Sequence, residues 1–187
     1  MAFLYHKLTR RLLLSLILVW SVASFLVLNP LWVARISILA LGALGLALTW
    51  AEIAPLFLLI FLAFSTSYAF YGFFFQYNLP TWLIMISILV IFGYIFTYTE
   101  QKTGILGNKR LIYLILFSLV VLEVFLVLSY FMINPLSQSL IIAATAYLFA
   151  GFCFSILAKR DDTSLKTYLW VAISAISAIL LTSSWSY

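Results

Sequence analysis

The chain has 187 residues, of which 66% are hydrophobic and only 8% are charged. Soluble domains carry roughly 25% charged residues, and a body of this size cannot bury so much apolar surface within itself. The composition therefore excludes a water-soluble globular domain and a disordered chain, and it indicates a protein whose surrounding solvent is lipid.

Seven apolar runs are long enough to cross a bilayer as helices, which takes roughly 20 residues each. The runs are apolar at odd and even positions alike, which excludes the alternating pattern of barrel strands. We therefore predict an all-α fold, a transmembrane helical bundle in one domain, 1–187, whose loops are too short for a soluble domain. In chain order the predicted spans are Leu12–Leu28, Leu31–Trp50, Ala54–Phe75, Thr81–Tyr98, Leu111–Ile133, Ser137–Ala158 and Thr167–Trp185.

Two features leave six spans as an alternative to seven. The first run follows basic residues and contains Ser21-Val22-Ala23, which resembles the cleavage site of a secretory signal, although the run is longer than a usual signal core. Only residues 51–53 separate the second and third runs. That pair is either a tight hairpin or one long kinked helix.

The basic residues predict how the chain is oriented. Nine of the ten fall on one side of a seven-span arrangement, and Arg35 is the exception. The positive-inside rule assigns that side to the cytoplasm, so we expect an integral protein of a bacterial-type plasma membrane with its N-terminus inside and its C-terminus outside. The net charge of +5 is thus a topology signal, and we expect no nucleic-acid partner. The nine residues are Lys7, Arg10, Arg11, Lys102, Lys109, Arg110, Lys159, Arg160 and Lys166.

Small residues are frequent in three of the runs, which favours close helix packing in lipid. They include Gly42 and Gly45 in the second run and Gly151 in the sixth, and the seventh is rich in alanine and serine. We expect these helices to pack centrally in the bundle or to form a partner interface.

Glu123 is the residue most suggestive of function. It lies twelve positions after Leu111, roughly 18 Å along a helix that rises about 1.5 Å per residue, which is near the centre of the bilayer. Carboxylates at this depth are costly and usually functional. Without a partner the group is expected to be neutral, whereas a cation beside it would let it ionise.

Three roles remain open for Glu123: a neutral acid that joins two helices, a proton or substrate site, or a contact to another subunit. Candidate intramolecular partners at similar depth are Ser65, Thr66, Ser67, Thr145 and Tyr147. Arg35 is predicted to reach the outer headgroups, with a salt bridge to Glu123 or an anion site as the alternatives.

Aromatic residues are concentrated in the outer half of the third run. Tyr68, Tyr71 and Phe75 share one helical face at three- and four-residue spacing. Interfacial packing explains such a face, and an aromatic pocket for an apolar or cationic ligand is the alternative.

The chain lacks the residues that several kinds of functional site require. The chain has one Cys and one His, which cannot form a His/Cys metal site, and it contains no nucleotide-binding glycine loop and no nucleophile elbow. No lysine lies in a predicted span, which excludes a retinal Schiff base. We therefore predict no catalytic residue, no metal and no cofactor.

The composition and the single intramembrane acid favour a non-enzymatic membrane protein, either a small-solute transporter or a membrane subunit of a larger assembly. A structural or accessory role without transport is one alternative. An intramembrane enzyme that acts on lipid or on a membrane-embedded substrate is another. The expected partners are the lipid bilayer and other membrane subunits or further copies of the chain.

Overall fold

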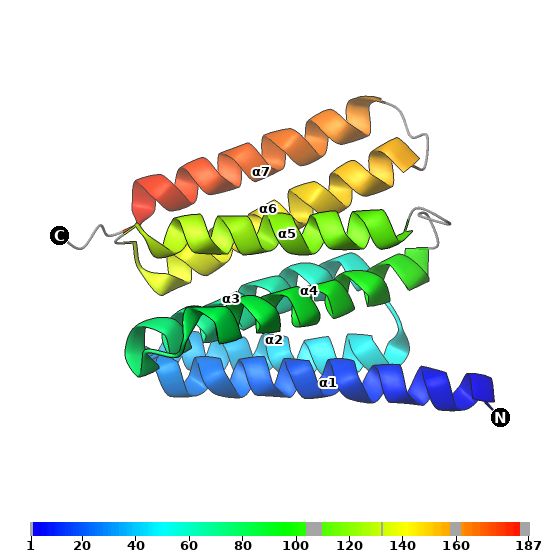
Figure 1. Ribbon diagram of the computed structural model, residues 1–187, viewed down its shortest axis with the longest axis horizontal. Helices are drawn as coiled ribbons and strands as arrows, with labels where there is room; N and C mark the ends of the chain where they lie inside the picture. The colour runs from blue at the N-terminus through cyan, green and yellow to red at the C-terminus, as the bar shows by residue number, and fades with distance from the viewer. Residues whose placement is uncertain (1, 104–109, 132, 158–161, 184–187) are drawn as a thin grey trace.

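The computed structural model describes residues 2–103, 110–131, 133–157 and 162–183. Seven helices occupy most of this part of the chain, lie side by side and alternate in direction (Figure 1). The predicted all-α architecture of seven helices is confirmed. The helices are α1 (Ala2–Leu28), α2 (Trp32–Ala51), α3 (Pro55–Tyr77), α4 (Thr81–Thr103), α5 (Arg110–Ser129), α6 (Pro135–Leu157) and α7 (Asp162–Thr182).

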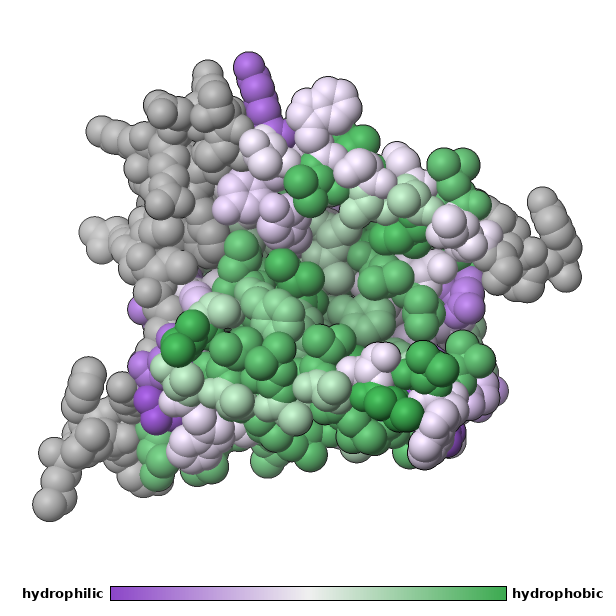
Figure 2. Space-filling model, turned by 180° about the vertical axis from the view of Figure 1, so that it is seen from behind, coloured by the Kyte–Doolittle hydropathy of each residue, from purple (hydrophilic) through white to green (hydrophobic). Residues whose placement is uncertain are grey.

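Six of the helices, α1 to α6, are long and apolar enough to cross a membrane. In α7 the apolar stretch, Lys166–Thr182, is shorter than that length. Figure 2 shows a broad hydrophobic area across the middle of one face, with the hydrophilic residues mainly towards its margins. This distribution fits a helical bundle whose middle is surrounded by hydrocarbon.

The chain reverses within three residues between α2 and α3. Glu52 and Ala54 adopt left-handed backbone conformations, with φ of 60° and 53°, and the Glu52 amide donates to the Leu48 carbonyl. Pro55 is the first residue of α3, where a missing amide donor costs little. The tight hairpin is therefore confirmed, and the alternative of one long kinked helix is wrong.

Helix α3 is the centre of the bundle. It packs against α1, α2, α4 and α6, and its buried residues run almost without a break from Leu58 to Gly72. By contrast, α2 and α7 lie at the edges, because α7 packs against α6 and most α2 contacts are with α1. The expectation of central packing thus holds for α6 but not for α2 or α7.

The glycines nevertheless lie where helices approach closely. A Cβ atom added to Gly42 would lie 3.0 Å from Val22 Cγ2 in α1, and one added to Gly45 would lie 2.9 Å from Leu18 Cδ1. A Cβ on Gly151 would overlap the ring of Tyr168 in α7. Small residues therefore attach the two peripheral helices to the bundle.

Helix α5 ends at Ser129, four residues before the predicted end of its span. The buried side chain of Gln138, in α6, bonds to the backbone on both sides of this end. Its Nε2 donates to the Leu128 carbonyl at 2.8 Å and to the Phe131 carbonyl at 3.1 Å. One amide group thus gives a second donor to two carbonyls that also accept from the backbone amides of Phe131 and Ile133.

We expect Gln138→Leu to lower the free energy of unfolding by about 1–3 kcal/mol, because two hydrogen bonds from the side chain to backbone carbonyls are lost. Chemical denaturation in detergent micelles measures the change. The matched control is Gln76→Leu, since Gln76 is exposed near the end of α3. An equal effect of the two substitutions would contradict this role of Gln138.

The basic residues gather at one end of the bundle. The start of α1, the end of α4 and the starts of α5 and α7 lie at this end (Figure 1), and together they carry Lys7, Arg10, Arg11, Lys102, Arg110 and Lys166. Arg35 lies at the opposite end, at the start of α2. The other three of the nine basic residues predicted on one side are outside the described residues. They are Lys109, Lys159 and Arg160.

Candidate functional site

Helix α5 directs one face into the bundle and Glu123 away from it. Phe117, Val121 and Phe125 are buried, where α5 packs against α4 and α6. The Phe125 ring stacks on Tyr71 of α3 with centroids 4.2 Å apart, and the Tyr71 hydroxyl donates to the Phe125 carbonyl at 3.1 Å. These contacts fix the rotation of α5 about its axis and leave Glu123 exposed.

The residues around Glu123 form a continuous outward-facing line, which we call the α5 stripe. It is apolar apart from Glu123 and the hydroxyl of Tyr130, and all six of its members are exposed. It extends over 18 residue steps, about 27 Å at 1.5 Å per residue, or most of the thickness of a bilayer core. The α5 stripe consists of Ile112, Leu116, Leu119, Glu123 and Val127 of α5 and of Tyr130, the residue after its end.

The side chains predicted as partners of Glu123 do not bond to it. Ser65 is buried in α3 and bonds to Ser21 of α1 at 2.9 Å, and Ser67 donates to the Ala63 carbonyl in its own helix. Thr145 donates to the Ile141 carbonyl of α6. The hydroxyl of Thr66 is buried without a partner in the described part of the chain. Within the described ranges, Glu123 makes no hydrogen bond or ion pair.

Arg35 is likewise directed away from Glu123. Its Nε donates to the Asn29 carbonyl at 2.6 Å, so the guanidinium group folds back over the turn between α1 and α2. Helix α2 packs on α1 and α3, whereas α5 packs on α4 and α6. This placement provides no salt bridge between Arg35 and Glu123.

The aromatic residues of α3 separate into a buried set and an exposed set. Tyr68 and Tyr71 belong to the core, with 7% and 0% of their surface exposed, whereas Phe75 is 44% exposed. Tyr68 lies on Phe25 of α1, with ring centroids 4.3 Å apart. Two of the three residues of the predicted aromatic face are therefore buried in contacts between helices.

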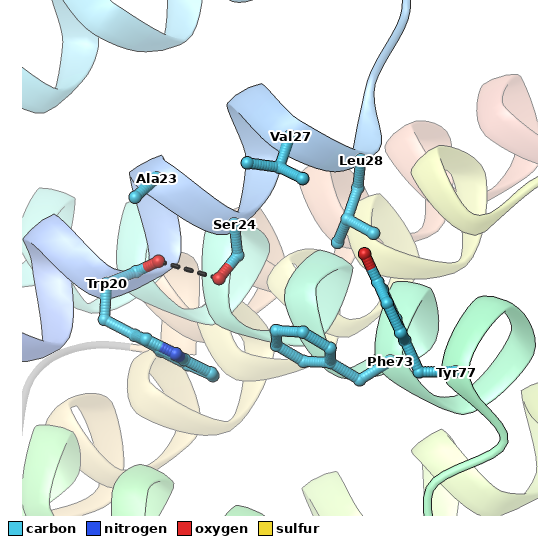
Figure 3. Close-up of a pocket in the computed structure, with 7 residues that line it drawn as sticks. All are labelled: Trp20, Ala23, Ser24, Val27, Leu28, Phe73 and Tyr77. Carbon is cyan, nitrogen blue, oxygen red and sulfur yellow. Dashed lines mark hydrogen bonds between the residues drawn. The ribbon is translucent and has the colours of Figure 1, made fainter.

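An aromatic groove is instead formed between α1 and α3. Trp20, Phe73 and Tyr77 line it together with smaller residues of α1 (Figure 3), and its volume is about 240 Å³. Within it the Ser24 hydroxyl donates to the Trp20 carbonyl at 2.8 Å, which leaves the lining largely apolar. The aromatic run in α3 was the sequence signal for this groove. Residue spacing alone could not show which side of α3 faces α1.

A second groove lies where α6 and α7 meet α3, with a volume of about 440 Å³. Alanines on α6 and α7 make room for it, and Tyr147 is its most polar side chain. The Tyr147 ring lies against Tyr168, with centroids 5.1 Å apart. Both grooves are apolar, and neither includes Glu123.

An ion pair that the sequence did not reveal lies at the basic end of the bundle. Arg11 of α1 donates through Nε to Glu52 Oε1 at 2.9 Å, and Arg11 Nη2 donates to the same oxygen. The guanidinium group also lies 6.0 Å from the centre of the Trp50 ring. The pair holds the α2–α3 hairpin against α1, so Glu52 has a structural role here.

The described residues contain no group of three or more His, Cys, Asp or Glu side chains placed to hold a metal ion. No model of a known protein family matches the chain, and no curated protein or solved structure matches it. The outward position of Glu123 is therefore the main structural indication of what the protein does.

Proposed function

We propose that the protein is a membrane-embedded subunit of a larger assembly and that the α5 stripe is its docking face. The observation that carries this proposal is the exposed carboxyl group of Glu123 on an otherwise apolar transmembrane helix. A polar group in hydrocarbon costs several kcal/mol when it has no hydrogen-bonding partner. A helix of a partner subunit removes that cost by supplying the missing group at the same depth.

Transport and catalysis receive less support from the same geometry. A coupled transporter needs a polar path to its midplane acid, and the two grooves described above are apolar and lie away from Glu123. An enzyme needs two or three polar side chains that converge on a substrate, and the buried hydroxyls of α3 and α6 bond mainly within their own helices.

Site-specific photo-cross-linking in native membranes tests the docking face. A photoreactive amino acid at Leu119 is expected to give a discrete protein adduct, and Glu123→Leu in the same chain is expected to weaken it. The matched control is Val33, which is 76% exposed on α2 and is expected to give none. The absence of an adduct at Leu119, or equal adducts at both positions, would refute the proposal.

We further propose that the basic end of the bundle faces the cytoplasm, which the positive-inside rule supports. Single cysteines at exposed Arg10 and Lys166 are then expected to react with an impermeant maleimide only after the membrane is opened. Cysteines at exposed Asn78 and Asn134 are expected to react in intact cells. Labelling of Arg10 and Lys166 positions from opposite sides would contradict this topology.

A further inference from the structure

The aromatic groove between α1 and α3 reaches the end of the bundle at which Arg35 lies. Its α1 lining extends from Trp20 to Leu28, which is eight residue steps or about 12 Å at 1.5 Å per residue. Half of a roughly 30 Å hydrocarbon core is about 15 Å, so the groove spans most of one leaflet. An acyl chain of that leaflet therefore has the length to lie along the whole groove.

The lining of the groove suits a hydrocarbon chain. The Trp20 ring stacks on Phe73 with centroids 6.0 Å apart, and Ala23 leaves room beside the two rings (Figure 3). The Ser24 hydroxyl is already bonded to the Trp20 carbonyl. A chain in this groove gains dispersion contacts with the rings and leaves no hydroxyl of α1 without a partner.

Arg35 places a positive charge at the mouth of this groove. Its Nε donates to the Asn29 carbonyl, and Asn29 directly follows Leu28, which lines the groove. The two Nη nitrogens make no hydrogen bond or ion pair within the described ranges. Exposed Tyr77 directs its hydroxyl towards Leu28 at the same mouth (Figure 3). Two donors therefore lie near the point at which an acyl chain leaves the groove.

The described part of the chain provides no acid that could neutralise Arg35. Glu123 lies midway along α5, and the other described acids lie at the basic end, namely Glu52, Glu100 and Asp162. A phosphate group is an anion that the planar arginine fork binds with two hydrogen bonds. A zwitterionic headgroup would also bring an ammonium group, which finds no described carboxylate here. The charges therefore favour a phospholipid with a net negative charge.

We propose that this groove binds an anionic phospholipid, with one acyl chain between α1 and α3 and its phosphate bonded to the Nη nitrogens of Arg35. The bound lipid contacts α1 and α3 through its chain and α2 through its headgroup. The site is separate from the α5 stripe, because α5 packs against α4 and α6.

Photo-labelling of the full chain in reconstituted vesicles tests the site. The vesicles consist of phosphatidylcholine with a minor fraction of phosphatidylglycerol that carries a diazirine on one acyl chain. Mass spectrometry is expected to find adducts within residues 20–28 and 73–77 at about ten times the yield on the exposed residues 39–41 of α2. Unlabelled phosphatidylglycerol in excess should remove this difference. Equal yields on the groove and on α2 would overturn the proposal.

Two substitutions test the headgroup contact and the chain contact separately. Arg35→Gln is expected to lower the groove labelling about tenfold, because a charge-assisted contact is lost, whereas Arg10→Gln at the other end should leave it unchanged. Ala23→Trp, at an exposed position, fills the groove and should lower the labelling as much. Its matched control is Ala40→Trp on the exposed face of α2, which should have no effect.

Equal losses in Arg35→Gln and Arg10→Gln would overturn the headgroup contact, since they would reflect the net charge of the protein alone. Undiminished labelling of Ala23→Trp would overturn the position of the chain. A phosphatidylcholine probe with the same diazirine chain should label the groove weakly, and labelling equal to that by phosphatidylglycerol would overturn the preference for an anionic lipid. Glycerol phosphate in the buffer should not compete, and competition would assign the site to a free phosphate in place of a lipid.

Discussion

Replacing Gly151 by leucine is expected to detach α7 from the bundle. A Cβ atom at this position would already overlap the Tyr168 ring, and the longer side chain cannot be accommodated unless the two helices separate. Overpacking of this kind costs about 1–3 kcal/mol. Because α7 packs chiefly against α6, that cost falls on a single contact and should displace the whole helix.

The displacement is measured by the reactivity of a cysteine at Ala172, which is 1% exposed in α7. In a Cys153→Ser background, Ala172→Cys should react slowly with a membrane-permeant maleimide and at least tenfold faster when Gly151→Leu is added, which corresponds to about 1.4 kcal/mol. Gly93→Ala is the control, because its Cβ would meet Ser118 Oγ at 3.2 Å and needs only a small adjustment. An unchanged rate in the Gly151→Leu protein would show that α7 is held by other contacts.

Placing a carboxylate on the inner face of α5 is expected to be far more harmful than removing the one on its outer face. Val121 is 1% exposed, so Val121→Glu buries an unpaired polar group. This substitution should lower the free energy of unfolding by about 3–5 kcal/mol. Glu123→Leu should leave the free energy of unfolding of the monomer unchanged or should raise it, because the lost carboxyl group has no partner inside the monomer.

Chemical denaturation in detergent, at a dilution that keeps the protein monomeric, measures both effects. Leu119→Glu serves as the matched control, since Leu119 is 48% exposed on the same helix and should tolerate the acid much better than Val121. A loss of more than about 1 kcal/mol on Glu123→Leu would mean that the carboxyl group has a hydrogen-bonding partner inside the monomer.

The helices were predictable because continuous apolar runs and turn residues are local signals. The predicted starts of the runs at Leu31, Ala54 and Thr81 are within one residue of the starts of α2, α3 and α4. The first helix begins earlier than predicted, because its basic segment continues as helix before the apolar run. The end of α5 was misplaced because the apolar run continues to Ile133, whereas the chain turns after Ser129, where Gln138 of α6 bonds to the Leu128 and Phe131 carbonyls.

The candidate site could be identified but not oriented from the sequence. A carboxylate deep within an apolar run is visible at Glu123, yet which face it occupies depends on contacts with other helices, such as Tyr71 with Phe125. In lipid both faces of a helix are apolar, so hydrophobic periodicity carries little information about rotation. The ion pair of Arg11 with Glu52 joins residues 41 positions apart and has no local signature.

The most direct test of the outward carboxyl group is its reaction with dicyclohexylcarbodiimide, a lipid-soluble reagent that attacks neutral carboxyl groups. In the detergent-dispersed monomer, mass spectrometry should find the adduct on Glu123 and not on Glu100, which is 5% exposed. A water-soluble carbodiimide should leave Glu123 unmodified. If Glu123 stayed unmodified while a glutamate placed at Leu119 reacted, the carboxyl group would lie inside the bundle, contrary to this account.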